Sequence, residues 1–294
     1  MPRDIRLIDV PYDSGHRGVR HGAGPGVLVA AGAGDRLAAS DAEVSTVQVR
    51  LPEGFALENG TSVGVMRAVA DEVAEAVGVG ASPVVLAGNC GVTLGVVAGL
   101  GAATGGLRVG VLWCDAHGDL QQPHTTASGF FDGMGLTMLT GRVWQTLAAS
   151  VPGHTPLPDE AVVLVGGHDL DEAEVELIAG SALTHLPARA FADGDAVTDV
   201  LDRLAAEVDV IHLHVDLDVL DTAIAPANSY AVPGGVQPAD LVRLAREAAA
   251  RRPLVSLTVA SWDPSLDPLH RMRDTALDLL ETFGSLLGPA RVEA

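Results

Sequence analysis

Short apolar runs alternate with longer amphipathic segments along the chain, a pattern typical of parallel strands joined by crossover helices. The runs expected to form strands are Ile5–Val10, Val44–Val49, Pro83–Ala87, Val109–Trp113, Ala161–Val165, Val210–His214 and Val255–Val259. The segments expected to form helices include Ser62–Val77, Ala239–Arg251 and Asp274–Leu287. The pattern predicts an α/β fold whose ligands gather at the carboxyl ends of the strands.

No internal repeat or charge run divides the chain, so residues 1–294 are expected to form a single domain. The polar, glycine-rich segment Gly118–Gly133 is longer than a usual connection from strand to helix. Long loops at strand ends often carry function, so this segment is a candidate for substrate contact.

The chain has 18 basic and 38 acidic residues, a formal net charge of -20, and no lysine. Such a surface repels phosphate backbones and anionic lipids, so neither nucleic acid nor a membrane is an expected partner. Two cysteines, Cys90 and Cys114, are too few for a disulfide framework. Because no segment has the pattern of a signal peptide or a transmembrane helix either, we expect a cytoplasmic protein.

Two clusters of acidic residues follow predicted strands. Asp115, His117 and Asp119 occupy alternate positions after one strand, and Asp216 and Asp218 do so after another. Alternate side chains of an extended segment share a face, so each cluster is expected to point in one direction. Ionised carboxylates crowded at the end of a buried strand repel each other and need a compensating cation.

The four carboxylates of the two clusters would be neutralised by two divalent cations. Oxygen ligands with one imidazole suit Mn²⁺ better than Zn²⁺. Two such ions could share a bridging water, lower its pKa and deliver hydroxide to an electrophilic carbon, which predicts a hydrolase. A single cluster could also be explained by Asp acting as a helix cap or turn residue, and Asp221 suits that role better than metal binding.

The clusters lie within longer motifs. Trp113–Asp119, followed by Thr125–Gly129, resembles the second metal motif and substrate loop of the arginase/agmatinase (ureohydrolase) family. Asp216–Asp221, with Ala225–Ala227 and Pro233–Gly235 after it, resembles that family's third motif. The resemblance implies a three-layer α/β/α fold with an eight-stranded parallel sheet, assembly into a homo-oligomer (a trimer or hexamer), and a binuclear Mn²⁺ site. The implied reaction is attack of metal-bound hydroxide on a guanidine-like, amidine or amide carbon of a small molecule.

By motif position, the resemblance implies that Asp115 and Asp216 bridge the two ions. It implies that Asp119 binds the first ion and that His117 and Asp218 bind the second.

A sixth ligand is altered, because Cys90 stands where the family usually has a histidine. A thiolate at a helix N-terminus could bind the metal, and this softer ligand would favour Zn²⁺, Fe²⁺ or Co²⁺. The alternative is a small buried thiol beside a first site that is weak or empty. A minority of the family that acts on hydroxylated guanidines resembles this chain in having Cys here.

Further replacements concern proton transfer and substrate. Asp132 stands where the family loop has a histidine that shuttles protons, and it is a candidate acid or base if its pKa is raised. His124 in the same loop is an alternative shuttle, or simply an exposed histidine.

Ser261 stands where the family has the glutamate that pairs with the substrate's guanidinium, and Phe130 replaces an amide. The remaining residues expected at the substrate are Gln121, Ser128, Asp171 and Tyr230. These changes predict a less cationic substrate than arginine.

Two interpretations stay open for His214, which shares the face of Asp216: a group that supports the metal ligands, or a hydrogen-bonded core histidine. The enzyme hypothesis also has an alternative. A non-catalytic relative would bind one metal or none and serve as a small-molecule or protein-binding module. Its support is that Cys90, Asp132 and Ser261 replace the family's usual residues.

Overall fold

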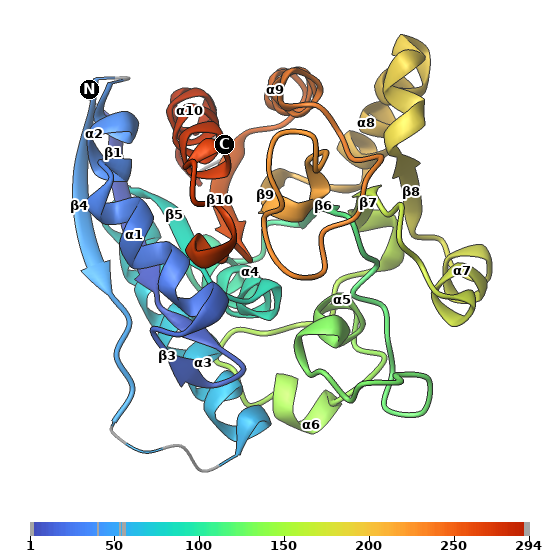
Figure 1. The fold of residues 1–294 in the computed structure, drawn as a ribbon, viewed down its shortest axis with the longest axis horizontal. Coiled ribbons are helices and arrows are strands. Elements are labelled where there is room, and N and C mark those ends of the chain that lie inside the picture. The colour runs from blue at the N-terminus through green and yellow to red at the C-terminus, as the bar shows by residue number, and fades with distance from the viewer. Residues whose placement is uncertain (1–2, 40, 53, 55–56, 291–294) are drawn as a thin grey trace.

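The computed structural model describes residues 3–39, 41–52, 54 and 57–290 (Figure 1). Its main sheet has eight parallel strands in the order β4-β1-β5-β10-β9-β6-β7-β8. Their bounds are β1 (Arg3–Val10), β4 (Ala42–Gln48), β5 (Ser82–Ala87), β6 (Val109–Asp115), β7 (Val162–Gly166), β8 (Thr184–Pro187), β9 (Val210–Asp216) and β10 (Leu254–Ala260). A small antiparallel pair, β2 (Tyr12–Asp13) and β3 (His16–Arg17), lies outside it.

All seven strands predicted from the apolar runs are confirmed to within two residues at each end. The eighth strand, β8, was not predicted from the pattern. It is a four-residue edge strand in which Leu186 is buried and the other three residues are partly exposed. Such a segment produces no apolar run, although the family resemblance implied eight strands.

The helices are α1 (Gly24–Ala30), α2 (Ala33–Ala38), α3 (Glu58–Gly78), α4 (Thr93–Thr104), α5 (Gly135–Leu139), α6 (Gln145–Ala148), α7 (Glu172–Ala179), α8 (Gly194–Glu207), α9 (Pro238–Ala249) and α10 (Arg271–Leu286). The three predicted helices correspond to α3, α9 and α10. Within the described ranges, none of the helices combines the length and apolar character needed to cross a membrane.

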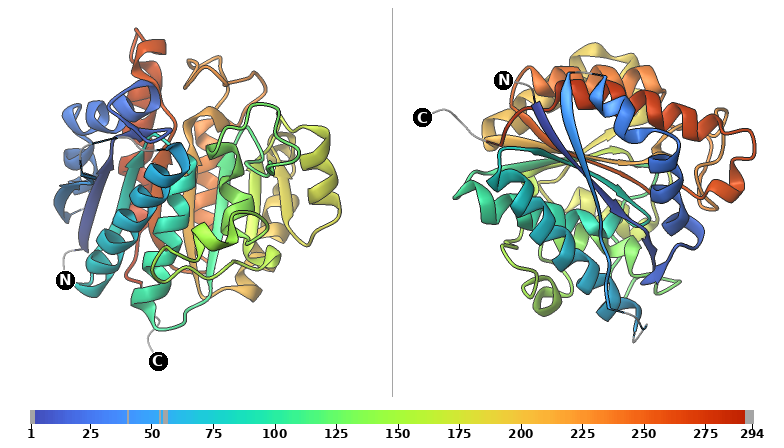
Figure 2. Two further views of the ribbon diagram at one scale, coloured as in Figure 1. Left: turned by 90° about the horizontal axis from the view of Figure 1, so that it is seen from below. Right: turned by 90° about the vertical axis from the view of Figure 1, so that its left-hand side faces the viewer.

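Helices cover both faces of the twisted sheet (Figure 2). One face carries α1, α2, α8, α9 and α10, and the other carries α3, α4, α5 and α6. Neighbouring residues of β6 point to opposite layers: Cys114 packs in the first hydrophobic cluster and Trp113 in the second. Cys114 is therefore a packing residue of the core.

The four central strands of the sheet, β5, β10, β9 and β6, are neighbours in space although they are far apart in the chain. Because all four are parallel, their carboxyl ends meet at one edge. The residues that follow them include Cys90, Ser261, Asp218 and His117. The topology thus gathers the predicted ligands from distant segments into one place.

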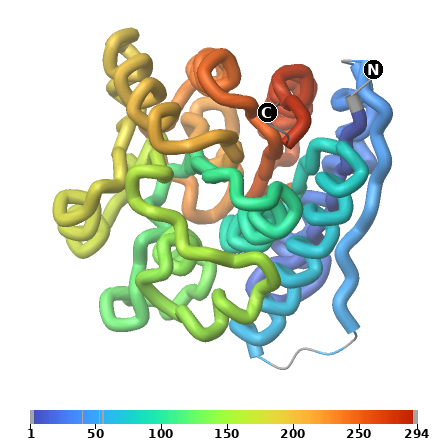
Figure 3. The backbone as a smooth tube through the Cα atoms, turned by 180° about the vertical axis from the view of Figure 1, so that it is seen from behind, coloured from blue at the N-terminus to red at the C-terminus, as the bar shows by residue number. Residues whose placement is uncertain are grey.

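The helices α3 and α4 lie side by side on one face of the sheet, as the tube drawing seen from behind also shows (Figure 3). Their close approach depends on Gly95 of α4. A Cβ atom added there would lie 2.3 Å from the backbone oxygen of Met66 in α3. Since both atoms belong to packed helices, neither can move without separating the pair.

We predict that Gly95→Ala lowers the free energy of unfolding by about 2 kcal/mol or more, because the helices must separate. Gly60→Ala is the matched control, since Gly60 lies in α3 with open space around the added methyl group. Because alanine has a higher helix propensity than glycine, Gly60→Ala should raise the free energy of unfolding by up to about 1 kcal/mol. Urea unfolding measures both, and equal effects would contradict the close packing at Gly95.

Candidate metal centre and active-site cavity

The end of β6 positions the first predicted cluster. Asp115 is the last residue of the strand, and its Oδ1 accepts a hydrogen bond of 2.8 Å from the backbone N–H of His117. The Nδ1 atom of His117 lies 3.3 Å from Asp115 Oδ1 and 3.3 Å from Asp218 Oδ2. Asp119 then takes a left-handed backbone conformation with φ 48°, which is uncommon for a residue with a side chain and often occurs at functional sites.

The end of β9 positions the second cluster. Asp216 Oδ1 accepts a hydrogen bond of 2.7 Å from the N–H of Asp218, at the start of a short 3₁₀ turn. Asp218 in turn accepts from the N–H of Ala116 through Oδ1 and from the side-chain amide of Asn228 through Oδ2. These bonds tie the ends of β6 and β9 together and hold the two clusters face to face.

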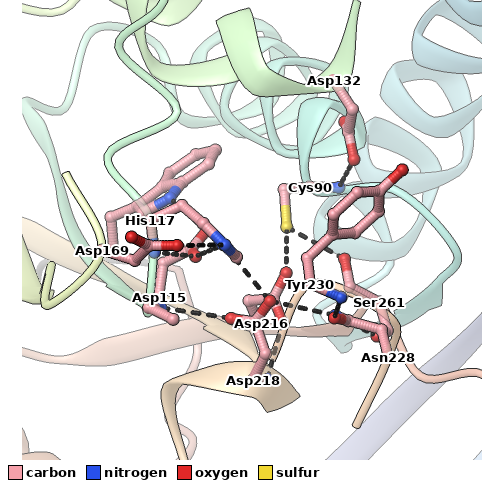
Figure 4. Close-up of polar contacts among 12 residues, drawn as sticks. Cys90, Asp115, His117, Asp132, Asp169, Asp216, Asp218, Asn228, Tyr230 and Ser261 are labelled. Carbon is pink, nitrogen blue, oxygen red and sulfur yellow. Dashed lines mark hydrogen bonds and ion pairs between the residues drawn. The ribbon is translucent and has the colours of Figure 1, made fainter. Parts of the chain in front are cut away.

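Cys90 follows β5 and lies against the second cluster (Figure 4). Its Sγ is 3.0 Å from Asp216 Oδ2, to which the thiol donates, and 3.2 Å from the hydroxyl oxygen of Ser261. Burial raises the pKa of the Cys90 thiol, and the nearby carboxylates raise it further. Without a bound cation, burial among acidic groups therefore favours the protonated thiol, and the thiolate expected for metal binding stays a prediction.

The carboxylates are buried without enough positive charge to balance them. Burial, reinforced by the neighbouring Asp218, raises the pKa of Asp115 to about 6. Burial and neighbouring carboxylates also raise the pKa values of Asp119 and Asp216 well above the usual range. Burial lowers the pKa of the His117 ring, but its hydrogen bonds to Asp115 and Asp218 outweigh this and raise it. A divalent cation would restore the ionised carboxylates and displace the proton from His117.

The donor atoms fit such cations. One group of three, Cys90, Asp115 and His214, and another, Asp115, His117 and Asp218, each have ligand atoms within 4.8 Å of one another. Asp115 belongs to both groups. The set combines oxygen, imidazole and sulfur donors, so it suits a transition metal better than Mg²⁺ or Ca²⁺.

Asp132 lies beside Cys90 and is already engaged. Its Oδ2 accepts from the N–H of Cys90 and the amide of Asn89, and its Oδ1 accepts from the N–H of Gly91. Burial raises its pKa to about 7, although these three donors oppose the shift. Asp132 therefore anchors the turn that carries Cys90, and its proposed part in proton transfer stays a prediction.

The clusters form the floor of a cavity of about 290 Å³. The predicted residues that line it are Cys90, His117, Asp119, Gln121, Ser128, Phe130, Asp132, Asp171, Asp216, Asp218, Tyr230 and Ser261. Asp115 lies just beneath this surface, where it contacts His117. His124 is exposed on the loop and does not line the cavity, which favours the interpretation of an exposed histidine over that of a proton shuttle.

Several cavity residues were not predicted. The buried side chain of His21 lines the cavity, and so do Asp169, Leu170, Glu174 and Asn228. Glu174 accepts from the N–H groups of Leu120 and Asp171 and so joins the long loop after β6 to α7. An Asp-x-x-Glu spacing at a helix start was the available signal, since Asp171 and Glu174 form a capping box.

Comparison with known proteins decides the family. The arginase family model matches residues 3–284. The arginase of Bacillus caldovelox is 30% identical over 304 residues, covering 97% of this chain and 98% of that protein. The chain belongs to the arginase family. The crystal structure of arginase from Bacillus cereus has a TM-score of 0.85 with 26% sequence identity and covers 96% of this chain and 98% of that one.

Membership of the arginase family confirms the resemblance found in the motifs and the eight-stranded parallel fold. A further relative, the Nω-hydroxy-L-arginine amidinohydrolase of Streptomyces lavendulae, is 35% identical over 161 residues, covering 53% of this chain and 52% of that protein. Assembly of this family member into a homo-oligomer stays a prediction.

We predict that Mn²⁺ or Co²⁺ stabilises the metal-stripped protein, because a cation relieves the repulsion among the buried carboxylates. Saturation at 100 times the dissociation constant adds about 2.7 kcal/mol per site, or several degrees in Tm. Asp218→Asn should lose most of the shift. Asp221→Asn is the control, because the Asp221 carboxylate accepts from the N–H groups of Ala223 and Gly234 and is not a proposed metal ligand. The metal-induced shift in Tm should persist in this variant. Equal shifts in the two variants would argue against metal binding at Asp218.

Proposed function

We propose that this chain is a metal-dependent hydrolase that cleaves an amidine-type C–N bond in a small molecule other than arginine. The observation that carries the proposal is the meeting of two donor groups, joined through Asp115, at the floor of a cavity in an arginase-family fold. A volume of about 290 Å³ accommodates a small molecule and not a polymer.

The proposed ligands are Cys90, Asp115, His117, Asp119, Asp216 and Asp218. When bound, the metal ions would supply Lewis acidity and an activated water for attack on the amidine carbon. The chain's own contribution is to hold the ligands in place: Asn228 orients Asp218, and the N–H of His117 orients Asp115. Asp132 keeps Cys90 at the floor through the hydrogen bonds described above.

At Ser261 the inner wall of the cavity presents a hydroxyl in place of the carboxylate that the family resemblance implies for a guanidinium. Ser261 is buried and takes a left-handed conformation with φ 64°, and its short hydroxyl lies against Cys90. A charge-assisted hydrogen bond contributes roughly 1.5–3 kcal/mol more than no bond, so its loss weakens binding of arginine about 10- to 150-fold. A substrate whose head group is less basic than a guanidinium loses less binding free energy when this carboxylate is absent.

The outer wall is partly aromatic. The rings of Phe130 and Tyr230 stack with centroids 5.9 Å apart and planes inclined by 28°. Tyr230 is 52% exposed, so the pair lies at the mouth, and no arginine is present among the described residues that line the cavity. This rim favours an apolar or planar substrate tail over an amino-acid carboxylate.

A hydroxylated guanidine meets the requirement of the inner wall, because its electron-withdrawing hydroxyl group lowers the basicity of the head, whereas the rim selects the tail. The name of the Streptomyces lavendulae relative, an Nω-hydroxy-L-arginine amidinohydrolase, supports this class. The proposed substrates are therefore hydroxyguanidines and other weakly basic amidines.

We predict that the protein loaded with Mn²⁺ or Co²⁺ hydrolyses a hydroxyguanidine or a neutral amidine at least about 10-fold more efficiently than arginine, judged by kcat/KM. A panel with matched tails should contain arginine, agmatine, Nω-hydroxyarginine and aromatic amidines, with product release followed by mass spectrometry. Preference for arginine would contradict the substrate class. Absence of turnover by a fully metal-loaded protein would instead favour the non-catalytic alternative.

Ser261→Glu is predicted to improve arginine hydrolysis about 10-fold or more, because it returns a carboxylate to the inner wall. Ser261→Gln is the control, since it adds the same bulk without charge. Metal content must be measured in both variants. If both retain two ions and neither changes the ratio of arginine to hydroxyguanidine turnover, the assigned position of Ser261 in the pocket is incorrect.

A further inference from the structure

His214 is a buried histidine of β9 whose ring is only half satisfied. Its side chain is fully buried, and its Nδ1 lies 2.8 Å from the hydroxyl of Thr93 at the start of α4. Its Nε2 is buried and has no hydrogen-bond partner. An unpaired buried nitrogen costs free energy comparable to a lost hydrogen bond, so a fold rarely keeps one without a use.

The ring lies against the metal centre. A ring nitrogen of His214, the Sγ of Cys90 and a carboxylate oxygen of Asp115 are all within 4.8 Å of one another. The Nδ1 atom is taken by Thr93, which leaves Nε2 as the available donor. The indole of Trp113 packs on the ring with centroids 4.1 Å apart and restricts its movement.

His212 offers a comparison on the same strand and the same face. Its ring is also fully buried, but both nitrogens have partners: Nδ1 lies 2.7 Å from the hydroxyl of Ser256, and Nε2 lies 3.3 Å from that of Thr258. His212 is therefore a satisfied core histidine. Of the two histidines on β9, only His214, the one nearer Cys90, has a ring nitrogen without a partner.

We infer that His214 binds the first metal ion through Nε2 and supplies the imidazole that Cys90 does not provide. This rests on the proposed function, because it concerns the same metal centre. Thr93 would accept from Nδ1–H, which fixes the tautomer and aims the Nε2 lone pair at the ion, as outer hydrogen-bond partners of metal-bound histidines do.

The inference gives the two sites different character. The first would combine the sulfur of Cys90, the imidazole of His214 and carboxylates, whereas the second would combine His117 with carboxylates. Sulfur and nitrogen donors favour Zn²⁺, Co²⁺ or Fe²⁺ over Mn²⁺. We therefore expect the first site to select a softer ion than the second.

His214→Asn tests the inference, because the asparagine amide can keep the bond to Thr93 while Nε2 is removed. In metal-stripped protein titrated with Co²⁺, affinity at the first site should fall at least about 10-fold, with the second site unchanged. The matched control His212→Asn should bind two ions as the wild type does. Unchanged binding of two ions by His214→Asn would overturn the inference and leave the proposed function intact.

A measurement of ligand identity avoids dependence on the folding of His214→Asn. In His117→Asn loaded with one Zn²⁺, X-ray absorption should detect one sulfur at about 2.3 Å and one imidazole. The imidazole signal should disappear in His117→Asn/His214→Asn. Sulfur without imidazole in the single variant would refute the role of His214 alone, whereas failure of the wild type to bind any ion would refute both it and the proposed function.

Discussion

The structure depends on one electrostatic constraint: carboxylates are buried together at the ends of central strands. Asp115, Asp119, Asp216 and Asp218 are each at most 9% exposed. Neutral N–H donors satisfy part of their hydrogen-bonding capacity but cannot cancel their mutual repulsion, so three of the four have raised pKa values. A fold that retains such a cluster trades stability in the metal-free state for affinity toward a cation.

Hydrogen bonds and helix packing around the carboxylate cluster hold it in place. Asn228 joins Asp218 to the backbone of Ser261, and Asp132 joins the turn of Cys90 to the long loop after β6. Close packing of α4 on α3 fixes the helix that begins beside Cys90 and carries Thr93. The metal ligands, the substrate wall and the hydrophobic layer are thus parts of one connected arrangement.

If Cys90 binds metal as we propose, its sulfur takes the place of the imidazole that the family resemblance implies there, and the centre changes its chemistry without losing a donor. On our proposals, sulfur from Cys90 and nitrogen from His214 make one site softer, while Ser261 and the rim of Phe130 and Tyr230 suit a less basic substrate. The changes in metal preference and in substrate preference are then linked, because Cys90 and Ser261 lie in contact at the inner wall of the cavity.

The sequence by itself determined the strands with apolar runs, the alternation that places Asp115, His117 and Asp119 together, and the family. These are local features, or long ordered motifs, which do not require knowledge of neighbours in space. Only the tertiary structure decided that Asn228 supports Asp218, that Asp132 binds the turn of Cys90, and that a ring nitrogen of His214 lies near Cys90. Such contacts join segments that are distant in the chain, because the order of strands in the sheet differs from their order in the sequence.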